Sequence, residues 1–445
     1  MSGEVEDVGV VVLGGGVAGL TVGAELGRHS MVLEREARPG GLVRTENFDG
    51  YWFDHVLHLL HLPDREIEQV VRALLGDVLE RCPPRALIDI AGHAVRYPFQ
   101  LNLGDLPPEL RDRCLADFAA LGAEAPVRHY GEQLLAMFGA SMCELFYFPY
   151  NRKQWRRPLD ELATTGFQWN LQRPSLDEIV RGSVKTGPRT EPYNKNGWYP
   201  RPLADAPVRG MEVLSRALAA RVGHLRTGHT VTEVDTAART VRARHAGGVS
   251  TVRYRACVST LPLPVVVELV PQIPAGLRAA CRRLPSTRVR SVALSVRGRR
   301  PAHRTLWHYY PDPATPFTRL VYMHNFDPAS APENGWGLLA EVPERADEAP
   351  ADDSALTAEV AAAARRVGAL APADEIIDSN VITADPAYVV FTEEARCTVA
   401  SARAALDRAG VVVLGRYGRW EYSSIAQVMT DARVLSRELR RSLED

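Results

Sequence analysis

The sequence has little that would hold it to a membrane or to nucleic acid. No apolar run approaches the roughly 18 residues needed to span a bilayer, and the first residues are acidic and polar rather than a basic and apolar leader. Basic and acidic residues nearly cancel, 53 against 54 in 445 residues, so no overall field attracts a polyanion. We therefore expect a cytoplasmic protein with no membrane or nucleic-acid partner.

Cysteine is also sparse and scattered. None of the six cysteines forms a CxxC pair, which argues against a zinc site and against a disulfide framework. We expect no metal site and reduced, buried thiols. The length, by contrast, is sufficient for two or three domains with a sizeable core.

Glycine is concentrated where the chain begins. Residues 8–45 predict a strand, a tight turn, a helix and a second strand that ends in an acid. In such a unit the first glycine permits the turn, the second lets backbone N–H groups reach a pyrophosphate, and the third lets the helix pack on the sheet. The start of the helix then directs its N–H groups at the phosphates. The residues assigned to a dinucleotide by this pattern are Gly14, Gly16, Val17, Ala18 and Gly19.

The acid that ends the second strand supports the same interpretation. Glu34 follows Gly14 by 20 positions, the separation expected of a carboxylate that accepts hydrogen bonds from the adenosine ribose. Arg35, the next residue, is expected beside it. A glycine turn kept for packing alone is the alternative, and it is disfavoured because strand, helix, second strand and acid all occur in order.

The next segment narrows the cofactor. Residues 38–45, RPGGLVRT, resemble the second glycine-pair motif of flavoproteins with two dinucleotide-binding domains, the group of amine oxidases, protoporphyrinogen oxidases and UDP-galactopyranose mutases. The resemblance implies FAD rather than NAD as the tightly held cofactor, contacted by Gly41, Leu42, Val43 and Arg44.

Four further segments resemble UDP-galactopyranose mutases. They are 58–64 (HLLHLPD), 150–155 (YNRKQW), 316–326 (PFTRLVYMHNF) and 415–422 (GRYGRWEY). The resemblance implies that His58 lies beside the flavin as a catalytic residue and that His61 is near the substrate. It also implies that Tyr150 and Trp155 line a nucleotide-sugar site; packed or surface residues are the alternative for the histidines, and a packed helix end is the alternative for the aromatic run.

Arginine is the residue best suited to a diphosphate. A guanidinium offers two parallel charge-assisted bonds to phosphate oxygens, and the resemblance makes Arg319 the principal substrate anchor and a catalytic residue. Arg173 falls where the mutases have the first arginine of Arg-x-Pro-x-Arg. Their second arginine has no counterpart in register, and Arg181 is the candidate replacement.

The chain ends with a second anion site. A strand, Gly415, Arg416 and a helix start suit the flavin pyrophosphate and its electron-rich carbonyl. The resemblance to mutases adds Tyr422 as a substrate or flavin contact. Further residues expected at the cofactor are Ser424, Ile425 and, through its backbone near the adenine, Val231.

The predicted fold is α/β, with a Rossmann-type FAD-binding domain, a helical insertion and an antiparallel-sheet substrate domain. Residues 1–100, 200–265 and 405–445 are assigned to the FAD-binding domain, residues 101–199 to the helical substrate-covering domain and residues 266–404 to the antiparallel sheet.

Three functions are compatible with these motifs. The first is a nucleotide-sugar mutase that isomerises pyranose and furanose forms through a flavin N5–sugar adduct on reduced FAD, with NAD(P)H as a candidate reductant. The second is an FAD oxidase or dehydrogenase of a small amine, alcohol or sugar, and the third is a flavin-dependent partner subunit. Departures from the mutase motifs at 56–57 (VL for GA), Val342 and Ser424 keep the alternatives open. A homodimer is also left open.

Overall fold

Apolar runs from both ends of the chain form one mostly parallel, seven-stranded sheet. The computed structural model describes residues 5–122, 126–166, 173–184 and 196–444. The strand order is β10-β2-β1-β13-β12-β11, with β19 paired to the last residues of β13. The strands are β1 (Val5–Leu13), β2 (Ser30–Leu33), β10 (His224–Arg226), β11 (Thr230–Asp235), β12 (Thr240–His245), β13 (Gly248–Ser259) and β19 (Val411–Val413).

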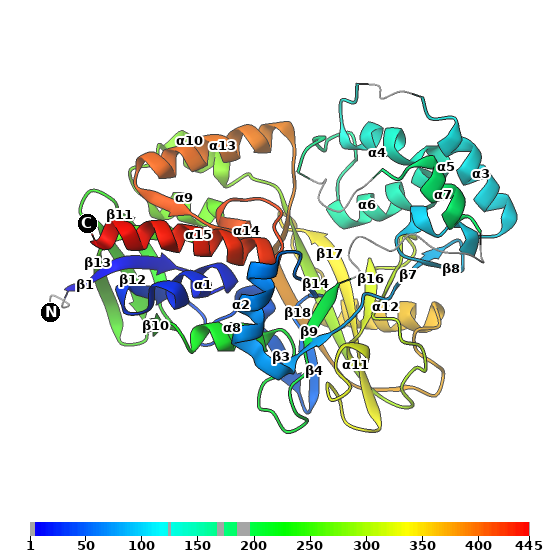
Figure 1. The fold of residues 1–445 in the computed structure, drawn as a ribbon, viewed down its shortest axis with the longest axis horizontal. Coiled ribbons are helices and arrows are strands. Elements are labelled where there is room, and N and C mark those ends of the chain that lie inside the picture. The colour runs from blue at the N-terminus through cyan, green and yellow to red at the C-terminus, as the bar shows by residue number, and fades with distance from the viewer. Residues whose placement is uncertain (1–4, 123–125, 167–172, 185–195, 445) are drawn as a thin grey trace.

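Both faces of this sheet are covered, because alternate residues of a strand point to opposite sides. Val10 and Val12 pack with helices α1 and α15, whereas Val11 and Leu13 pack with α9, α10 and α13 (Figure 1). The helices are α1 (Val17–Leu26), α8 (Glu212–Ala219), α9 (Leu263–Leu269), α10 (Ala275–Cys281), α13 (Glu393–Arg408), α14 (Gly415–Gly418) and α15 (Ile425–Glu444). This arrangement confirms the predicted Rossmann-type fold.

A second seven-stranded sheet has the order β18-β14-β17-β16-β15-β7-β8. Its strands are β7 (Ala86–Ile90), β8 (His93–Arg96), β14 (Ser286–Arg297), β15 (Trp307–Tyr309), β16 (Arg319–Tyr322), β17 (Gly335–Arg345) and β18 (Glu375–Val389), and α12 (Asp353–Arg366) packs on one face. All its pairings are antiparallel except that of β7 with β15. Residues 86–96, grouped from the sequence with the FAD-binding domain, therefore extend this sheet instead.

A group of helices lies above the second sheet (Figure 1). It contains α3 (Pro108–Ala119), α4 (Tyr130–Phe138), α5 (Ala140–Met142), a π-helical turn (Cys143–Tyr147), α6 (Phe148–Trp155) and α7 (Leu176–Gly182). Aromatic residues fill its core, and the rings of Phe138 and Tyr147 stack 3.9 Å apart. The helical insertion was predicted, although its range 101–199 includes residues outside the described ones, and the three-domain division as a whole remains a prediction.

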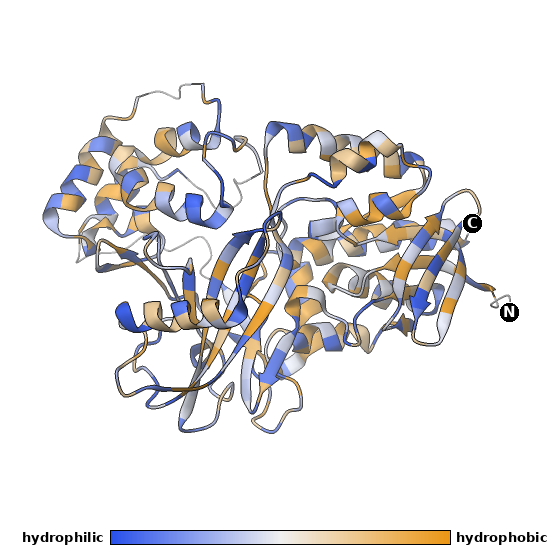
Figure 2. Ribbon diagram, turned by 180° about the vertical axis from the view of Figure 1, so that it is seen from behind, coloured by the Kyte–Doolittle hydropathy of each residue, from blue (hydrophilic) through white to orange (hydrophobic). Residues whose placement is uncertain are grey.

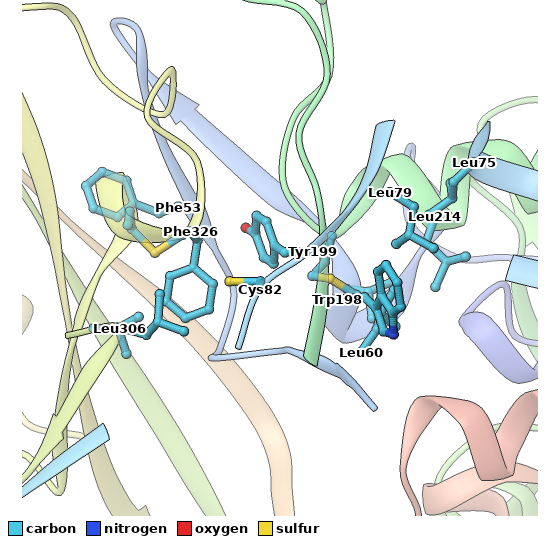
Figure 3. Packing of buried hydrophobic residues seen from close by; sticks show 14 of the residues in the cluster. Phe53, Leu60, Leu75, Leu79, Cys82, Trp198, Tyr199, Leu214, Leu306 and Phe326 are labelled. Carbon is cyan, nitrogen blue, oxygen red and sulfur yellow. The ribbon is translucent and has the colours of Figure 1, made fainter. Parts of the chain in front are cut away.

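Short elements join the two sheets. They are β3 (Thr45–Phe48), β4 (Tyr51–Asp54), β5 (Leu60–His61), α2 (Arg65–Leu75), β6 (Leu79–Arg81), β9 (Gly197–Pro200) and α11 (Met323–Phe326). Figure 3 shows Phe53, Tyr199 and Phe326 of this junction close together, and the last two rings are 5.1 Å apart. Figure 2 shows hydrophobic residues on the strands and on the helix faces that meet them. The described part of the chain contains no helix that is both long and apolar enough to cross a membrane.

Candidate active site

The glycine-rich turn between β1 and α1 uses its glycines in two ways. A Cβ on Gly14, whose φ is +99°, would lie 2.5 Å from the Oγ1 atom of Thr260, and a Cβ on Gly19 would lie 1.9 Å from the Gly14 carbonyl oxygen. The fold itself requires these two glycines. Gly16 differs, because a Cβ there would meet no atom within 4 Å. It precedes the first turn of α1 and carries no side chain to cap it, so the helix N–H groups suit the FAD pyrophosphate.

The second glycine pair adjoins the first. Gly16 and Gly40 form a parallel bridge, and the Gly40 N–H donates to the Gly15 carbonyl oxygen at 2.8 Å. A Cβ on Gly41, whose φ is +57°, would lie 3.3 Å from the Gly16 Cα atom. The side chain of Arg44 folds back and donates from Nε to the Gly41 carbonyl oxygen at 3.2 Å. The two motifs recognised in the sequence are thus one surface.

Glu34 lies under the same turn. It is 8% exposed, and its Oε2 atom accepts the Gly15 N–H at 2.7 Å while Oε1 accepts the Glu36 N–H at 2.8 Å. The chain leading to Val231 runs alongside, since the His229 N–H donates to the Glu34 carbonyl oxygen at 2.8 Å. The Arg35 side chain, by contrast, is 72% exposed.

The C-terminal motif reaches the start of α1. Gly415 has φ +77°, and a Cβ on it would lie 2.9 Å from the Ala18 Cβ atom, so α14 can begin here only with glycine. Ser424 precedes Ile425, the first residue of α15, and its Oγ atom accepts the Gln427 N–H at 3.2 Å. Segments from both ends of the chain therefore surround one place, as FAD requires.

Beside this place lies a group of side chains that we call the arginine–tyrosine cluster. Its members are Tyr150, Trp155, Tyr309, Arg319, Glu341, Tyr388, Arg416 and Tyr422. Arg319 and Glu341 are directly opposite each other on β16 and β17, and Nε of the arginine lies 2.5 Å from Oε2 of the glutamate. Their side chains are only 13% and 2% exposed. Burial opposes the charge of Arg319, but Glu341 and the tyrosines outweigh it and hold the arginine pKa well above its usual range.

Aromatic rings enclose the ion pair. The Tyr388 hydroxyl is 3.5 Å from an Nη atom of Arg319, and the Trp155 ring meets the Tyr388 ring edge-on at 5.8 Å. Tyr150 meets Tyr309 in the same manner at 5.4 Å. The Trp155 N–H donates to Oδ1 of Asn151 at 2.9 Å, which fixes the indole in the core of the helical group. Burial raises the pKa of Tyr150, Tyr309 and Tyr388, so these hydroxyls remain protonated donors.

Arg416 is the second cation of the cluster and is partly buried. Its guanidinium carbon is 4.0 Å from the Tyr422 ring centre and 5.2 Å from that of Tyr388, and an Nη atom donates to the Ala387 carbonyl oxygen at 3.2 Å. Among the described residues it pairs with no carboxylate, and its buried Nε atom has no hydrogen-bond partner. An electron-rich group such as a flavin carbonyl would satisfy that donor.

His58 completes the site. Its buried Nδ1 atom has no hydrogen-bond partner in the described structure, and burial, followed by the charges of Arg416 and Arg319, lowers its pKa to about 3. The preceding residue is fixed to the ion pair, because the Leu57 N–H donates to Oε1 of Glu341 at 2.6 Å. His58 is therefore neutral at ordinary pH.

Two departures from the mutase motifs have a packing explanation. Val56 joins a small apolar group with Leu42 and Val289, so a glycine there would leave space unfilled. Val342 is buried in the group under α12, on the face opposite Glu341. A hydroxyl at position 342 would point away from Arg319, and Tyr388 and Tyr309 supply hydroxyl groups on the correct side.

Two expected substrate residues have no contact with the cluster within the described parts of the chain. His61 pairs with Gly197 in a three-stranded sheet, and burial lowers its pKa. Arg173 is exposed ahead of α7. Arg181, the candidate replacement arginine, is also exposed and donates to the Asp177 carbonyl oxygen of its own helix at 3.2 Å.

Sequence reasoning missed three members of the cluster. They are Glu341, Tyr309 and Tyr388, none of which is among the residues expected at the site. Tyr309 lies opposite Arg319 on the neighbouring strand. The sequence signal that could have identified it is a tyrosine in one strand that pairs with an arginine in the next. Tyr388 comes from β18, which is not adjacent to β16, and nothing local identifies it.

Comparison with known proteins gives a family match over most of the chain. The sequence model of flavin containing amine oxidoreductases matches residues 17–386. A crystal structure of reduced UDP-galactopyranose mutase is similar, with a TM-score of 0.87, 20% identity and coverage of 98% of this chain and 95% of that one. Wild-type putrescine oxidase bound to putrescine has a TM-score of 0.63 and 14% identity, with coverage of 98% and 100%. A CLA-producing fatty acid isomerase from P. acnes has a TM-score of 0.62 and 13% identity, with coverage of 96% and 98%. At these identities the likeness describes the fold.

Proposed function

The chain belongs to the family of flavin containing amine oxidoreductases, and on that premise we propose that it is an FAD-dependent nucleotide-sugar mutase. The proposed reaction interconverts the pyranose and furanose forms of a sugar carried on a nucleoside diphosphate. The observation that carries the proposal is the pair of partly buried arginines in the cluster, Arg319 and Arg416.

Charge distinguishes the possible substrates. Two arginines against the single carboxylate of Glu341, with His58 neutral, leave one net positive charge in a buried site. Such a site repels a protonated amine and attracts a diphosphate, because Coulomb interactions are strong where water is excluded. This favours an anionic substrate over the amines that other members of the family oxidise.

The chain's own residues would hold the substrate at both ends. Arg319 is positioned to pair with the diphosphate, and the hydroxyls of Tyr309 and Tyr388 can donate to the same oxygens. The Trp155 ring is 7% exposed and packs edge-on against Tyr388, so a base would meet it at its exposed edge and beside Tyr388. Binding energy gained on the nucleotide would then orient the sugar.

Arg416 and His58 would face the flavin. When bound and reduced, FAD would supply an electron-rich nitrogen as the nucleophile for the anomeric carbon. A cation fixed at Arg416 favours that electron-rich form. Neutral His58 can donate or accept one hydrogen bond there but cannot act as a general acid at neutral pH.

One observation favours a second candidate function, that of an FAD oxidase or dehydrogenase. Among the residues that the structure describes, neither candidate for the second phosphate arginine of the mutases contacts Arg319, since Arg173 and Arg181 are exposed and lie at α7. An FAD oxidase or dehydrogenase of a neutral alcohol or sugar needs only one anchoring cation. Experiment must distinguish this oxidase or dehydrogenase from the proposed mutase.

The test compares the two oxidation states of the flavin. Dithionite-reduced protein should convert a UDP-pyranose into its furanose isomer, with no net redox change, and oxidised protein should not. The products are separated by anion-exchange chromatography. If reduced protein isomerises no nucleotide sugar while oxidised protein consumes oxygen with an alcohol or sugar, the mutase proposal is wrong. NAD(P)H as reductant is tested by the loss of flavin absorbance under anaerobic conditions.

A further inference from the structure

Lys153 lies between two members of the cluster on the same helix but points elsewhere. α6 carries Tyr150 and Trp155, which contact Tyr309 and Tyr388. The Lys153 side chain enters the loop between β15 and β16 instead, and the residue is 8% exposed. The mutase-like motif 150–155 therefore has a member without a place in the proposed substrate site.

The ammonium group of Lys153 is fully satisfied in that loop. Nζ donates to the carbonyl oxygens of Tyr310 at 2.9 Å and Asp312 at 2.8 Å, and lies 2.7 Å from Oγ1 of Thr315. An ammonium has three N–H donors, and all three are used. Burial lowers the pKa of Lys153 to about 7, although the negative charge of Asp312 acts to raise it. In the neutral form, the amine can still donate two bonds and accept one from the Thr315 hydroxyl.

The loop that receives Lys153 is continuous with the anion-binding strands. Tyr309 immediately precedes Tyr310, and Arg319 follows Thr315 by four residues. The two strands are joined firmly, since the Tyr310 N–H donates to the Thr318 carbonyl oxygen and the Thr318 N–H donates to that of Glu341, both at 2.9 Å. A shift of the loop would therefore move Tyr309 and Arg319 together.

We propose that Lys153 is a positioning residue that sets the separation between the aromatic residues of α6 and Arg319. It joins the helical group to the β15–β16 loop through three hydrogen bonds, and it acts on the substrate only through its neighbours. This proposal rests on the proposed function in one respect, which is that the cluster binds the substrate. The Lys153 contacts themselves do not depend on which substrate is bound.

The test uses Lys153→Met, which keeps the length of the side chain and removes its donors. The carbonyl oxygens of Tyr310 and Asp312 and the Thr315 hydroxyl then lose their shared donor, although the Asp312 carbonyl oxygen still accepts from the Thr315 N–H at 3.2 Å and the Thr315 hydroxyl at 2.9 Å. We expect KM for the nucleotide sugar to rise about tenfold, corresponding to about 1.4 kcal/mol of binding, while kcat stays within about twofold, and the flavin content and absorbance spectrum stay unchanged. Arg152→Met is the matched control, because Arg152 is exposed on the same helix and should change neither constant.

Thr315→Val provides a second variant that removes one acceptor with little change in shape. It should raise KM about threefold, and in the double variant the effects should be less than additive, because both act through one contact. If Lys153→Met does not fold, the KM of Thr315→Val, compared with the KM of Arg152→Met, tests the positioning role of Lys153. Unchanged KM in a folded, flavin-loaded Lys153→Met or Thr315→Val variant overturns the proposal.

Hydrogen exchange separates failure of this proposal from failure of the proposed function. In Lys153→Met, amides in residues 148–155 and 310–318 should exchange about tenfold faster than in the wild type, with or without UDP as a probe. No acceleration in either segment overturns the positioning role. If exchange accelerates as expected but the wild type neither binds UDP nor turns over a nucleotide sugar, the mutase assignment fails and the positioning role of Lys153 is retained for a different substrate.

Discussion

The glycine-rich turn and the arginine–tyrosine cluster lie side by side but are built in opposite ways. The turn presents backbone, and its geometry depends on the absence of side chains at Gly14 and Gly19, whereas a side chain at Gly16 would meet no protein atom within 4 Å. The cluster presents side chains, and its geometry depends on strand pairing that places Arg319 against Glu341. A backbone site recognises the constant part of a cofactor, whereas a side-chain site can be altered residue by residue to suit a substrate.

The sharpest test of this difference is Gly16→Ala. Because a Cβ at this position meets no protein atom within 4 Å and the backbone is extended with φ −75°, the apoprotein should fold with an unchanged melting temperature. The added methyl group would instead occupy the path of the pyrophosphate. We expect the affinity for FAD to fall by about 100-fold or more, roughly 3 kcal/mol, measured by flavin fluorescence during titration.

The control is Gly19→Ala, in which a Cβ would lie 1.9 Å from the Gly14 carbonyl oxygen. This variant should lose both stability and FAD. If Gly16→Ala binds FAD as tightly as the wild type, the cofactor does not approach the turn at Gly16 and the assignment of the site is wrong.

The cluster should respond differently, because its binding residues also carry stability. Arg319→Met leaves Glu341 buried at 2% exposure without its cation, which should cost about 3 kcal/mol of unfolding free energy and abolish detectable binding of UDP. Arg319→Met/Glu341→Gln should recover most of the stability and none of the binding. Urea unfolding and isothermal titration calorimetry measure the two properties. Recovery of UDP binding in the double variant would contradict a role for Arg319 as the anion anchor.

The glycine-rich turn and the arginine–tyrosine cluster also differ in how far the sequence predicted them. The turn could be predicted because its residues are consecutive and each glycine has a local reason. The cluster draws on segments near residues 150, 309, 319, 341, 388 and 416, and their meeting depends on how two sheets and a helical group pack. Arg319 and Arg416 were found through motifs, but Tyr388 was missed because its neighbours on β18 give no local indication of Arg319.

Lys153 illustrates the limit of a motif. In the sequence it stands among residues assigned to the substrate, and a cation between aromatic rings suggests phosphate binding. In the structure, Tyr150 and Trp155 face the cluster, whereas Lys153 lies on another side of α6 and faces the β15–β16 loop. A helix of this length can serve both a site and a domain contact, and only the packing shows which residue does which.

The regions should also differ in their response to pH. The glycines of the turn have no side chain that titrates, whereas His58 beside the cluster has a pKa of about 3 against an ordinary value of 6.5. Between these values, the unfolded chain takes up a proton that the folded chain does not. Unfolding free energy should therefore fall as pH decreases below 6.5, by up to about 1.4 kcal/mol per pH unit from this group.

The variant that isolates this contribution is His58→Leu, compared with the wild-type apoprotein by urea unfolding at pH 7, 6 and 5. Other groups titrate alike in both proteins, so the difference in slope belongs to His58. Parallel slopes would mean that His58 takes up a proton in the folded state over the same pH range as in the unfolded chain. The histidine would then be available as an acid near neutral pH.

The smallest expected effect concerns a single hydroxyl. Tyr388→Phe keeps the ring that packs against Trp155 and Tyr422 and removes only the oxygen 3.5 Å from Arg319. That contact is long, so its loss should leave stability unchanged and raise KM about threefold, or roughly 0.7 kcal/mol, with kcat unaffected if the hydroxyl meets the diphosphate equally in ground and transition states. Steady-state kinetics with reduced enzyme measures both constants. A fall in kcat instead of a rise in KM would mean that Tyr388 contacts the reacting sugar rather than the leaving diphosphate, and it would extend the cluster from binding into the chemical step.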